Sequence, residues 1–322
     1  MQIARQRSQK IGLNLPDSPG NLSLSELWGW HQVGQSLYRQ GVQQDGSVSW
    51  LQLKQELAWR SLESCRFCVH DCQVNRLNDA TGYCRLKTKS PVSGSYLHFG
   101  EERPISPTWA VFFSGCTMHC SYCHNWRETF DFSQSMEFDA ASLIQDLRKH
   151  QGEYRSLSFI GGTPEPHLHT IIDFVLALPS EIEVPLVFNN NATLSHEGLA
   201  LMEGVVDIYL PDFKHGNDQC AWKLTRIQNY LGSLCLNLDA YLAQRTAILV
   251  RHLVLPGHLN CCTRPVLELL ADRYPGIAIN IMFQYRPMYK AEDLPMINRS
   301  LSAEEEARVQ AWMHELGLKS VA

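Results

Sequence analysis

The sequence lacks a long apolar run, a low-complexity tract and a short-period repeat. No stretch approaches the roughly 18 to 20 apolar residues that a membrane-spanning helix needs, so we expect no membrane segment. Residues 1–7 also lack the apolar core of a secretory signal, which predicts a cytoplasmic protein. The net charge of −5 gives no general signal for binding nucleic acids, although it does not exclude a local basic patch.

The rest of the composition is that of an ordinary globular protein, with 44% apolar and 19% charged residues among 322. A chain of this length suits one large α/β domain with a smaller appendage, or two domains. Residues 1 to about 20 are polar with scattered proline and glycine, and we expect them to be loose. Two helices are predicted after them, at about 23–39 and 50–62.

The eleven cysteines are the unusual feature of the composition. Disulfides explain them poorly, because the chain is long, shows no secretion signal and has an odd number of cysteines. Seven fall in two compact groups: Cys65, Cys68, Cys72 and Cys84, then Cys116, Cys120 and Cys123. The other four lie in segments predicted to be helical, and we expect them to be packing residues: Cys220, Cys235, Cys261 and Cys262.

The first group has the spacing C-x2-C-x3-C-x11-C, which can close four sulfurs on one site. Structural zinc and an iron–sulfur cluster both accept four cysteines, and the sequence does not separate them. The second group has the spacing C-x3-C-x2-C in a loop that follows an apolar, β-prone run. Three thiolates on a four-iron cluster leave one iron open for another ligand, which predicts a reactive centre.

From residue 108 onward, short apolar runs alternate with helical patterns. The expected strands are 108–113, 156–160, 184–188, 206–210, 247–253 and 277–284. The expected helices are 138–150, 165–178, 195–203, 217–242, 261–273 and 302–316. This alternation predicts parallel βαβ units, which match an α/β fold with a partial (β/α)6 TIM-like barrel. A doubly wound open sheet is the alternative.

Unusual polar or glycine-rich clusters follow each expected strand. The first cluster is the loop with Cys116, Cys120 and Cys123. The others are Gly161-Gly162-Thr163, Asn189 to Asn191, Asp212 to Lys214, Arg251-His252 and Gln284-Tyr285. In parallel barrels, the chemistry lies at the carboxyl ends of the strands. The sequence therefore predicts that these clusters share one surface. Turn-forming asparagines, a salt bridge of Arg251 inside the barrel and packing of Gln284 and Tyr285 are the structural alternatives.

The motif C-x3-C-x2-C, with Tyr122 before its last cysteine, resembles that of the radical S-adenosylmethionine (radical SAM) superfamily. Cys123-His124-Asn125 is similar to the activating enzymes of glycyl-radical enzymes such as pyruvate formate-lyase. The N-terminal cysteines, residues 207–214 and residues 251–257 are closer to an uncharacterised branch that resembles the pyruvate formate-lyase activating enzyme. This resemblance covers about residues 63–288, and the first sixty residues match no family that we can name.

The resemblance implies that Cys116, Cys120 and Cys123 hold a [4Fe–4S] cluster whose fourth iron is chelated by the amine and carboxylate of SAM. One electron then cleaves SAM to methionine and a 5′-deoxyadenosyl radical, which abstracts a hydrogen atom from the substrate. The implied cofactor-binding residues are Tyr122, Gly161, Gly162, Thr163, Asn189, Asn191, Asp212, Lys214, Arg251 and Gln284. The family order is Gly-Gly-Glu-Pro, from which Thr163-Pro164-Glu165 departs, leaving Thr163 and backbone carbonyls as acceptors. The sequence assigns no catalytic side chain.

Three segments are expected: a helical extension at 1–62, a cysteine-rich metal-binding segment at 63–105, and the radical SAM core with its last helix at 106–322. The resemblance implies an electron donor such as flavodoxin or ferredoxin, and either a protein partner carrying a glycine or a small metabolite, peptide or RNA as substrate. A hypothesis of another class is a non-catalytic iron–sulfur or zinc protein that binds a partner or carries electrons. That hypothesis requires every cysteine group to be fully ligated by the protein itself.

Overall fold

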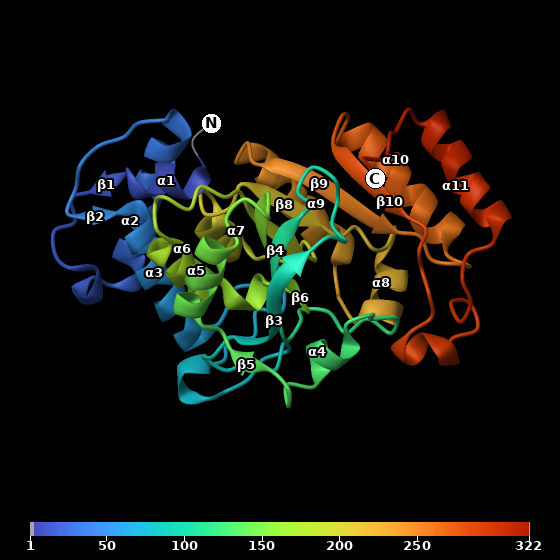
Figure 1. The fold of residues 1–322 in the computed structure, drawn as a ribbon, viewed down its shortest axis with the longest axis horizontal. Helices are drawn as coiled ribbons and strands as arrows, with labels where there is room; N and C mark the ends of the chain where they lie inside the picture. Colours follow the sequence, from blue (N-terminus) through green and yellow to red (C-terminus); the bar gives the residue numbers. More distant parts are fainter. Residues whose placement is uncertain (1–2, 322) are drawn as a thin grey trace.

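The computed structural model describes residues 3–321, and within them eight strands form the main sheet in the order β10–β9–β8–β7–β6–β4–β3–β5 (Figure 1). Strands β4 to β10, apart from β5, pair in parallel, while β3 and β5 add antiparallel pairs at one edge. Helices connect the parallel strands, as right-handed crossovers require. The predicted partial α/β barrel is confirmed.

Each predicted strand overlaps one strand of the parallel sheet. The observed bounds are β4 (Thr108–Phe113), β6 (Ser156–Gly161), β7 (Leu186–Asn190), β8 (Ile208–Pro211), β9 (Ala247–Leu253) and β10 (Ala278–Met282). The antiparallel strands β3 (Pro91–His98) and β5 (Met136–Glu137) were not predicted. β5 is exposed at the sheet edge and β3, beside it, is mostly half-buried, so neither carries the apolar run or clear alternation that marks a buried strand.

Apart from the short helix Trp126–Phe130, which was not predicted, the helices around the sheet also follow the apolar patterns. They are α4 (Trp126–Phe130), α5 (Ala140–Lys149), α6 (Leu168–Ala177), α7 (His196–Met202), α8 (Asp218–Thr225), α9 (Tyr230–Ala243), α10 (Arg264–Arg273) and α11 (Ala303–Glu315). The α6 stripe of Leu168, Ile171 and Val175 is fully buried, and α11 begins with a capping box of Ser302 and Glu305. No helix within residues 3–321 is long and apolar enough to cross a membrane.

Two predicted helices differ from the structure in ways that shape the site. The expected helix 217–242 is divided into α8 and α9, because Arg226 (φ 62°) and Asn229 (φ 48°) adopt left-handed conformations that an α-helix excludes. The expected helix 261–273 begins as α10 at Arg264, after a π-helical turn, η5 (Leu259–Thr263). Both differences lie at loops that face the carboxyl ends of β8 and β9.

The N-terminal extension consists of α1 (Ala4–Gln9), α2 (Leu24–Gln40) and α3 (Trp50–Arg60), with a short antiparallel pair, β1 (Gly12–Leu13) and β2 (Val48–Ser49). The expectation that residues 1 to about 20 are loose is wrong for α1, whose Arg5 and Ser8 are fully buried, while residues 1 and 2 lie outside the described range. Short 3-10 turns complete the chain: η1 (Pro19–Asn21), η2 (Ser61–Ser64), η3 (Arg76–Asn78), η4 (Glu165–His167) and η6 (Tyr289–Asp293).

The extension packs beside α6 and α7, at the amino ends of the neighbouring strands (Figure 1). The Arg5 guanidinium donates to the carbonyls of Leu178 (2.9 Å) and Ile182 (2.6 Å), just before β7. The buried Lys54 ammonium donates to the carbonyl of Leu201 at 2.9 Å, near the end of α7. Backbone carbonyls thus accept hydrogen bonds from two buried basic side chains. The extension covers the end of the barrel opposite the strand-end motifs.

Candidate cluster and cofactor site

The loop cysteines, Cys116, Cys120 and Cys123, lie directly after β4 on a loop held by neighbouring backbone. The N–H of His119 donates to the carbonyl of Thr225 at 3.0 Å, and the N–H of Ser121 to that of Leu224 at 2.8 Å. Both acceptors belong to the last turn of α8. The loop is therefore anchored between β4 and α8, which restricts the positions of its thiols.

All three loop thiols are shielded from solvent. Cys116 and Cys120 are buried and Cys123 is half-buried. Burial raises the pKa of each thiol, and the neighbouring Cys120 thiolate raises the pKa of Cys116 further. For Cys120 the pKa is raised to about 12. A cationic metal centre is the partner that favours three thiolates in such surroundings.

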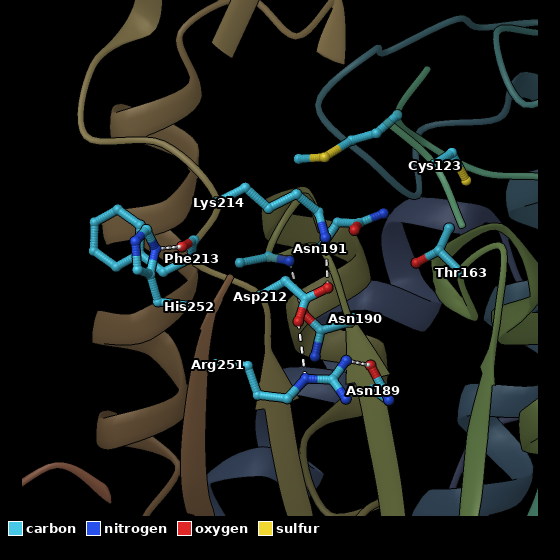
Figure 2. Close-up of polar contacts among 12 residues, drawn as sticks. Cys123, Thr163, Asn189, Asn190, Asn191, Asp212, Phe213, Lys214, Arg251 and His252 are labelled. Atoms are coloured by element: carbon cyan, nitrogen blue, oxygen red, sulfur yellow. Dashed lines mark hydrogen bonds and ion pairs between the residues drawn. The ribbon is translucent and has the colours of Figure 1, made fainter. Parts of the chain in front are cut away.

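A cavity of about 370 Å³ opens beside Cys120 and Cys123, within the range of about 300–1,000 Å³ that is usual for ligand pockets. Its wall contains all but one of the predicted cofactor-binding residues, which come from the ends of successive strands: Tyr122, Gly161, Gly162, Thr163, Asn189, Asn191, Asp212, Lys214 and Arg251. Figure 2 shows several of them, with Cys123 and Thr163 on one side and Arg251, Asp212 and Lys214 on the other. The strand-end motifs thus meet at one surface, as expected.

The two glycines at the end of β6 allow backbone segments to approach closely. Gly161 has φ of +113°, and a Cβ on Gly162 would lie 2.1 Å from the carbonyl oxygen of Gly115 in the cysteine loop. Only glycine tolerates both conditions. The glycine pair therefore brings the end of β6 against the cysteine loop and leaves this part of the cavity wall without side chains.

Ion pairs connect the side chains on the cavity wall opposite Cys123 and Thr163. The Arg251 Nε donates to Asp212 Oδ1 at 2.9 Å and Nη2 to Asn189 Oδ1 at 2.6 Å, while Lys214 Nζ lies 2.5 Å from Asp212 Oδ2 (Figure 2). Burial alone raises the pKa of Asp212, but the two adjacent cations outweigh burial and hold the pKa below its usual value. The salt bridge of Arg251 inside the barrel is thus present, at the cavity wall itself.

The three asparagines after β7 have different partners. Asn190 bonds its own loop, accepting from the N–H of Ala192 at 2.8 Å and donating to the carbonyl of Phe188 at 2.8 Å. Asn189 accepts from Arg251, whereas the Asn191 amide donates to the sulfur of Cys116 at 3.3 Å. Asn190 is therefore the asparagine that stabilises the turn. Asn189 contacts Arg251 at the cavity wall, and Asn191 contacts the cysteine loop.

Two acidic residues of the site were missed by sequence reasoning. Glu101 lines the cavity 3.4 Å from Arg251 Nη1, and burial raises its pKa to about 7. Glu165 lies behind the wall, where it accepts from the hydroxyls of Thr117 (2.9 Å) and Thr163 (2.8 Å). The order Thr163-Pro164-Glu165 was the signal for Glu165, which ties the cysteine loop to β6. No motif marks Glu101.

Some predicted contacts are arranged differently. Gln284 is exposed and is absent from the cavity wall, so the structure gives its predicted cofactor contact no support. Tyr285 is buried, with its hydroxyl donating to the carbonyl of Ile297 at 2.6 Å, as strand-end packing predicts. Tyr122 lines the cavity, and its hydroxyl lies 3.0 Å from His215 Nε2.

The N-terminal four, Cys65, Cys68, Cys72 and Cys84, are half-buried in loops beside the loop cysteines. The ring of Tyr83 stacks on His70 (centroids 3.7 Å apart) and on His119 of the cysteine loop (4.1 Å). Burial raises the pKa of Cys84, with smaller contributions from nearby Cys65 and Cys72. The N-terminal four therefore form a second thiol group in contact with the first loop.

The distances between the sulfurs indicate which kind of metal centre each set of cysteines suits. Four ligands of one zinc ion lie about 3.8 Å apart when Zn–S is about 2.3 Å. Within residues 3–321, neither the loop cysteines nor the N-terminal four contain three sulfurs within 4.8 Å of one another. A cluster of several irons separates its thiolates more widely than a single ion does. Three thiols beside a polar cavity therefore fit a [4Fe–4S] cluster with one open position and a bound SAM.

Comparisons with known proteins agree with this geometry. The profile of the Radical SAM superfamily matches residues 110–269. An uncharacterised protein of Methanocaldococcus jannaschii is 39% identical over 266 residues, 79% of this chain and 75% of that protein. The pyruvate formate-lyase 1-activating enzyme of Escherichia coli is 27% identical over 158 residues, 46% of this chain and 61% of that enzyme.

Among solved structures, a radical SAM methyltransferase from Sphaerobacter thermophilus superposes with a TM-score of 0.49 at 14% identity, covering 95% of this chain and 94% of that one. A score at this level adds no argument about function. The family profile and the 39% identical relative carry the assignment. The chain belongs to the radical SAM superfamily, whose members are enzymes that use a [4Fe–4S] cluster and S-adenosylmethionine.

Proposed function

We propose that this enzyme cleaves SAM reductively at the cavity beside the loop cysteines and uses the resulting radical to abstract hydrogen from its substrate. The observation that carries the proposal is that the cysteine loop, with Cys120 and Cys123 at the cavity wall, meets the strand-end residues around one cavity. When bound, the reduced cluster supplies one electron to SAM, which breaks into methionine and a 5′-deoxyadenosyl radical. The residues of this chain position and shield that chemistry.

Each part of the wall has a separate task in this proposal. Cys116, Cys120 and Cys123 hold the cluster, and the bare backbone at Gly161 and Gly162, with the Thr163 hydroxyl, accepts hydrogen bonds from the ammonium group of SAM. Arg251 supplies a forked donor for a carboxylate or for ribose oxygens. Asp212 already neutralises part of this cation, so SAM binding rearranges existing ion pairs and does not fill an unpaired cationic site.

We propose a protein partner as the substrate, with a glycine as the residue that loses hydrogen. The pyruvate formate-lyase 1-activating enzyme, which is 27% identical over part of the chain, supports this substrate class. A second support is the position of the N-terminal extension, which covers the opposite end of the barrel and leaves the cavity end free of it. A small metabolite, peptide or RNA substrate is the alternative within the same chemistry.

The N-terminal four are proposed as a second metal site. Zinc and an iron–sulfur cluster both accept four cysteines, and either metal centre suits this set of ligands. The stacking of Tyr83 on His70 and on His119 supports a position for this site beside the cysteine loop. An electron donor such as flavodoxin or ferredoxin is the proposed partner. Two thiol-based centres suit a reducing compartment, and we place the protein in the cytoplasm.

The test is anaerobic reconstitution with iron and sulfide, followed by reduction with dithionite in the presence of SAM. The wild-type protein is expected to release 5′-deoxyadenosine only when reduced, and Cys120→Ala is expected to release none. Cys235→Ser is the matched control, because Cys235 is a half-buried cysteine outside both groups. Absence of 5′-deoxyadenosine from a fully loaded, reduced wild-type protein would overturn the proposal and favour a non-catalytic iron–sulfur or zinc protein.

The substrate class has its own measurement. A partner protein deuterated at glycine should transfer deuterium into 5′-deoxyadenosine, and the partner should then show the electron paramagnetic resonance signal of a glycyl radical. Transfer from a deuterated small molecule instead would support the alternative substrate while leaving SAM cleavage intact.

A further inference from the structure

A third group of metal-binding side chains lies outside the cavity. The ligand atoms of Cys220, His258, Cys261 and Cys262 all lie within 4.8 Å of one another, and we name these four residues the C-terminal thiol group. The sequence predicts only packing roles for its cysteines, and that prediction overlooks their convergence. We infer that the C-terminal thiol group binds one zinc ion as a structural site.

The distances match the edges of a zinc tetrahedron. Bond lengths of about 2.3 Å for Zn–S and about 2.0–2.1 Å for Zn–N give edges of about 3.8 Å between sulfurs and about 3.5 Å between sulfur and nitrogen. The sulfurs of Cys220 and Cys261 lie 3.8 Å apart. His258 Nδ1 lies 3.4 Å from the sulfur of Cys261 and 3.9 Å from that of Cys262. Three cysteines and one histidine are an established donor set for structural zinc.

Local backbone structure produces this convergence. The π-helical turn η5 carries Cys261 and Cys262 directly after His258, and π-turns are frequent at functional sites. Cys220 comes from the first turn of α8, where Asn217 caps the helix and also donates to the carbonyl of Cys261 at 2.6 Å. A Cβ on Gly216 would lie 2.5 Å from the carbonyl oxygen of Cys262. The loops after β8 and β9 are therefore pressed together at this point.

A multi-iron cluster, a disulfide and simple packing each fit this group less well than one zinc ion does. A cluster of several irons requires more widely separated ligands than 3.8 Å, so the group suits a single ion. A disulfide between Cys220 and Cys261 would leave His258 and Cys262 without a role. Simple packing does not account for one imidazole nitrogen that faces two sulfurs, with a third sulfur beside them. With four protein ligands the site is closed, which is typical of structural and not catalytic zinc.

The C-terminal thiol group is linked to the cysteine loop through one histidine. His215 Nδ1 lies 3.7 Å from the sulfur of Cys262, and its Nε2 lies 3.0 Å from the hydroxyl of Tyr122. His215 directly follows Lys214 of the cavity wall. Residues that bond to metal ligands orient them. Zinc would therefore hold the loop after β8 against the loop after β9, on which the positions of Lys214 and Tyr122 depend.

The first test maps thiol protection on the full-length wild-type protein. Reduced protein with and without added Zn²⁺ is alkylated, and each cysteine is quantified in peptides by mass spectrometry. We expect Zn²⁺ to slow alkylation of Cys220, Cys261 and Cys262 at least about tenfold, the effect of about 1.4 kcal/mol of protection, and to leave Cys235 unchanged. Equal alkylation with and without zinc, or recovery of Cys220 and Cys261 as a disulfide under reducing conditions, would overturn the inference.

The second test measures metal content in variants. Cys261→Ser should lower the bound zinc by about one equivalent per chain, whereas Cys235→Ser should lower it by none. Co²⁺ at the group should give the intense visible bands of tetrahedral thiolate coordination, and Cys261→Ser should remove them. Because the mapping uses the wild-type chain, failure of the variant to fold would not block the test. Unchanged zinc content and cobalt spectra in a folded Cys261→Ser protein would reject the site.

Discussion

The loop cysteines and the C-terminal thiol group both collect sulfur at the carboxyl ends of strands, but with different spacings. The loop sulfurs are too far apart for a single ion and border a cavity of about 370 Å³, whereas the C-terminal ligand atoms lie within 4.8 Å of one another. An open wall suits a centre that exchanges a ligand, and a closed tetrahedron suits a centre that does not. The difference separates a reactive from a structural role.

Replacing the loop cysteines should separate the two groups most sharply. With Cys116, Cys120 and Cys123 all changed to serine, we expect SAM cleavage to fall to background, because no thiolate remains to hold the cluster. The zinc-dependent protection of Cys261 should persist. Cluster absorbance, 5′-deoxyadenosine release and alkylation mapping measure the three effects. Loss of protection at Cys261 in a folded variant would mean that the two groups are one coupled site.

A substitution in the glycine pair should also affect the loop cysteines and not the C-terminal thiol group, but with a smaller loss of activity. Gly162→Ala places a methyl group 2.1 Å from the carbonyl oxygen of Gly115, and overpacking of this kind costs about 1–3 kcal/mol. We expect the rate of SAM cleavage to fall about tenfold to hundredfold, with zinc content unchanged. Gly29→Ala is the matched control, because nothing lies within 4 Å of its added Cβ. A wild-type rate in Gly162→Ala would contradict the close approach.

Arg251→Lys should have a smaller effect, by weakening the binding of SAM at the cavity beside the loop cysteines. Lysine keeps the charge but loses the fork that reaches both Asp212 and Asn189. We expect the Kd for SAM to rise about tenfold, the effect of losing one charge-assisted hydrogen bond of about 1.5 kcal/mol. Calorimetry on the reconstituted protein measures the Kd. Arg273→Lys, at an exposed pair with Asp239, should leave it unchanged, and equal affinities in both variants would remove Arg251 from the binding wall.

A further difference between the two groups concerns pH, since the cavity wall contains the carboxylates of Glu101 and Asp212 and the C-terminal thiol group contains none. The folded pKa of Glu101 is about 7, above its ordinary value of 4.5, so the folded state holds a proton that the unfolded state has lost. Stability therefore falls as pH rises from about 4.5 to 7, by at most about 1.4 kcal/mol per pH unit.

Glu101→Gln should remove this part of the pH dependence and stabilise the protein near pH 7 relative to the wild type. Urea unfolding at a series of pH values measures the change, with the exposed Glu315→Gln as the control. A wild-type slope that survives in Glu101→Gln would assign the pH dependence to another group.

Periodicity and one topological rule account for most of what the sequence predicted. The apolar runs identified six parallel strands because strands covered on both faces are continuously apolar. Since parallel strands end at the same edge, Gly161, Asn189, Asp212 and Arg251 could be assigned to one surface from the order of the strands alone. The structure brings these residues to one cavity.

Features that depend on distant contacts were not predicted. The antiparallel strand β3 owes its place in the sheet to its pairing with β4 and not to its own apolar pattern. Cys220 and Cys261 are separated by 41 residues, and the π-turn after β9, held against the start of α8, brings them together. The role of such isolated cysteines can be recognised only when the positions of the loops in the fold are known. Glu101 was missed for the same reason, since nothing in its local sequence indicates burial.

The position of the N-terminal extension has a consequence for how the chain folds. Its anchoring contacts are formed with residues made much later: the Ala4 N–H reaches Asp207, 203 residues away, and Lys54 reaches Leu201, 147 residues away. Such pairs close large loops and form late. These helices leave the ribosome before the residues that they contact, and they are therefore among the last to dock. Their docking joins α1 and α3 to α7 and the start of β8, and so completes the half of the barrel that carries Asp212 and Lys214.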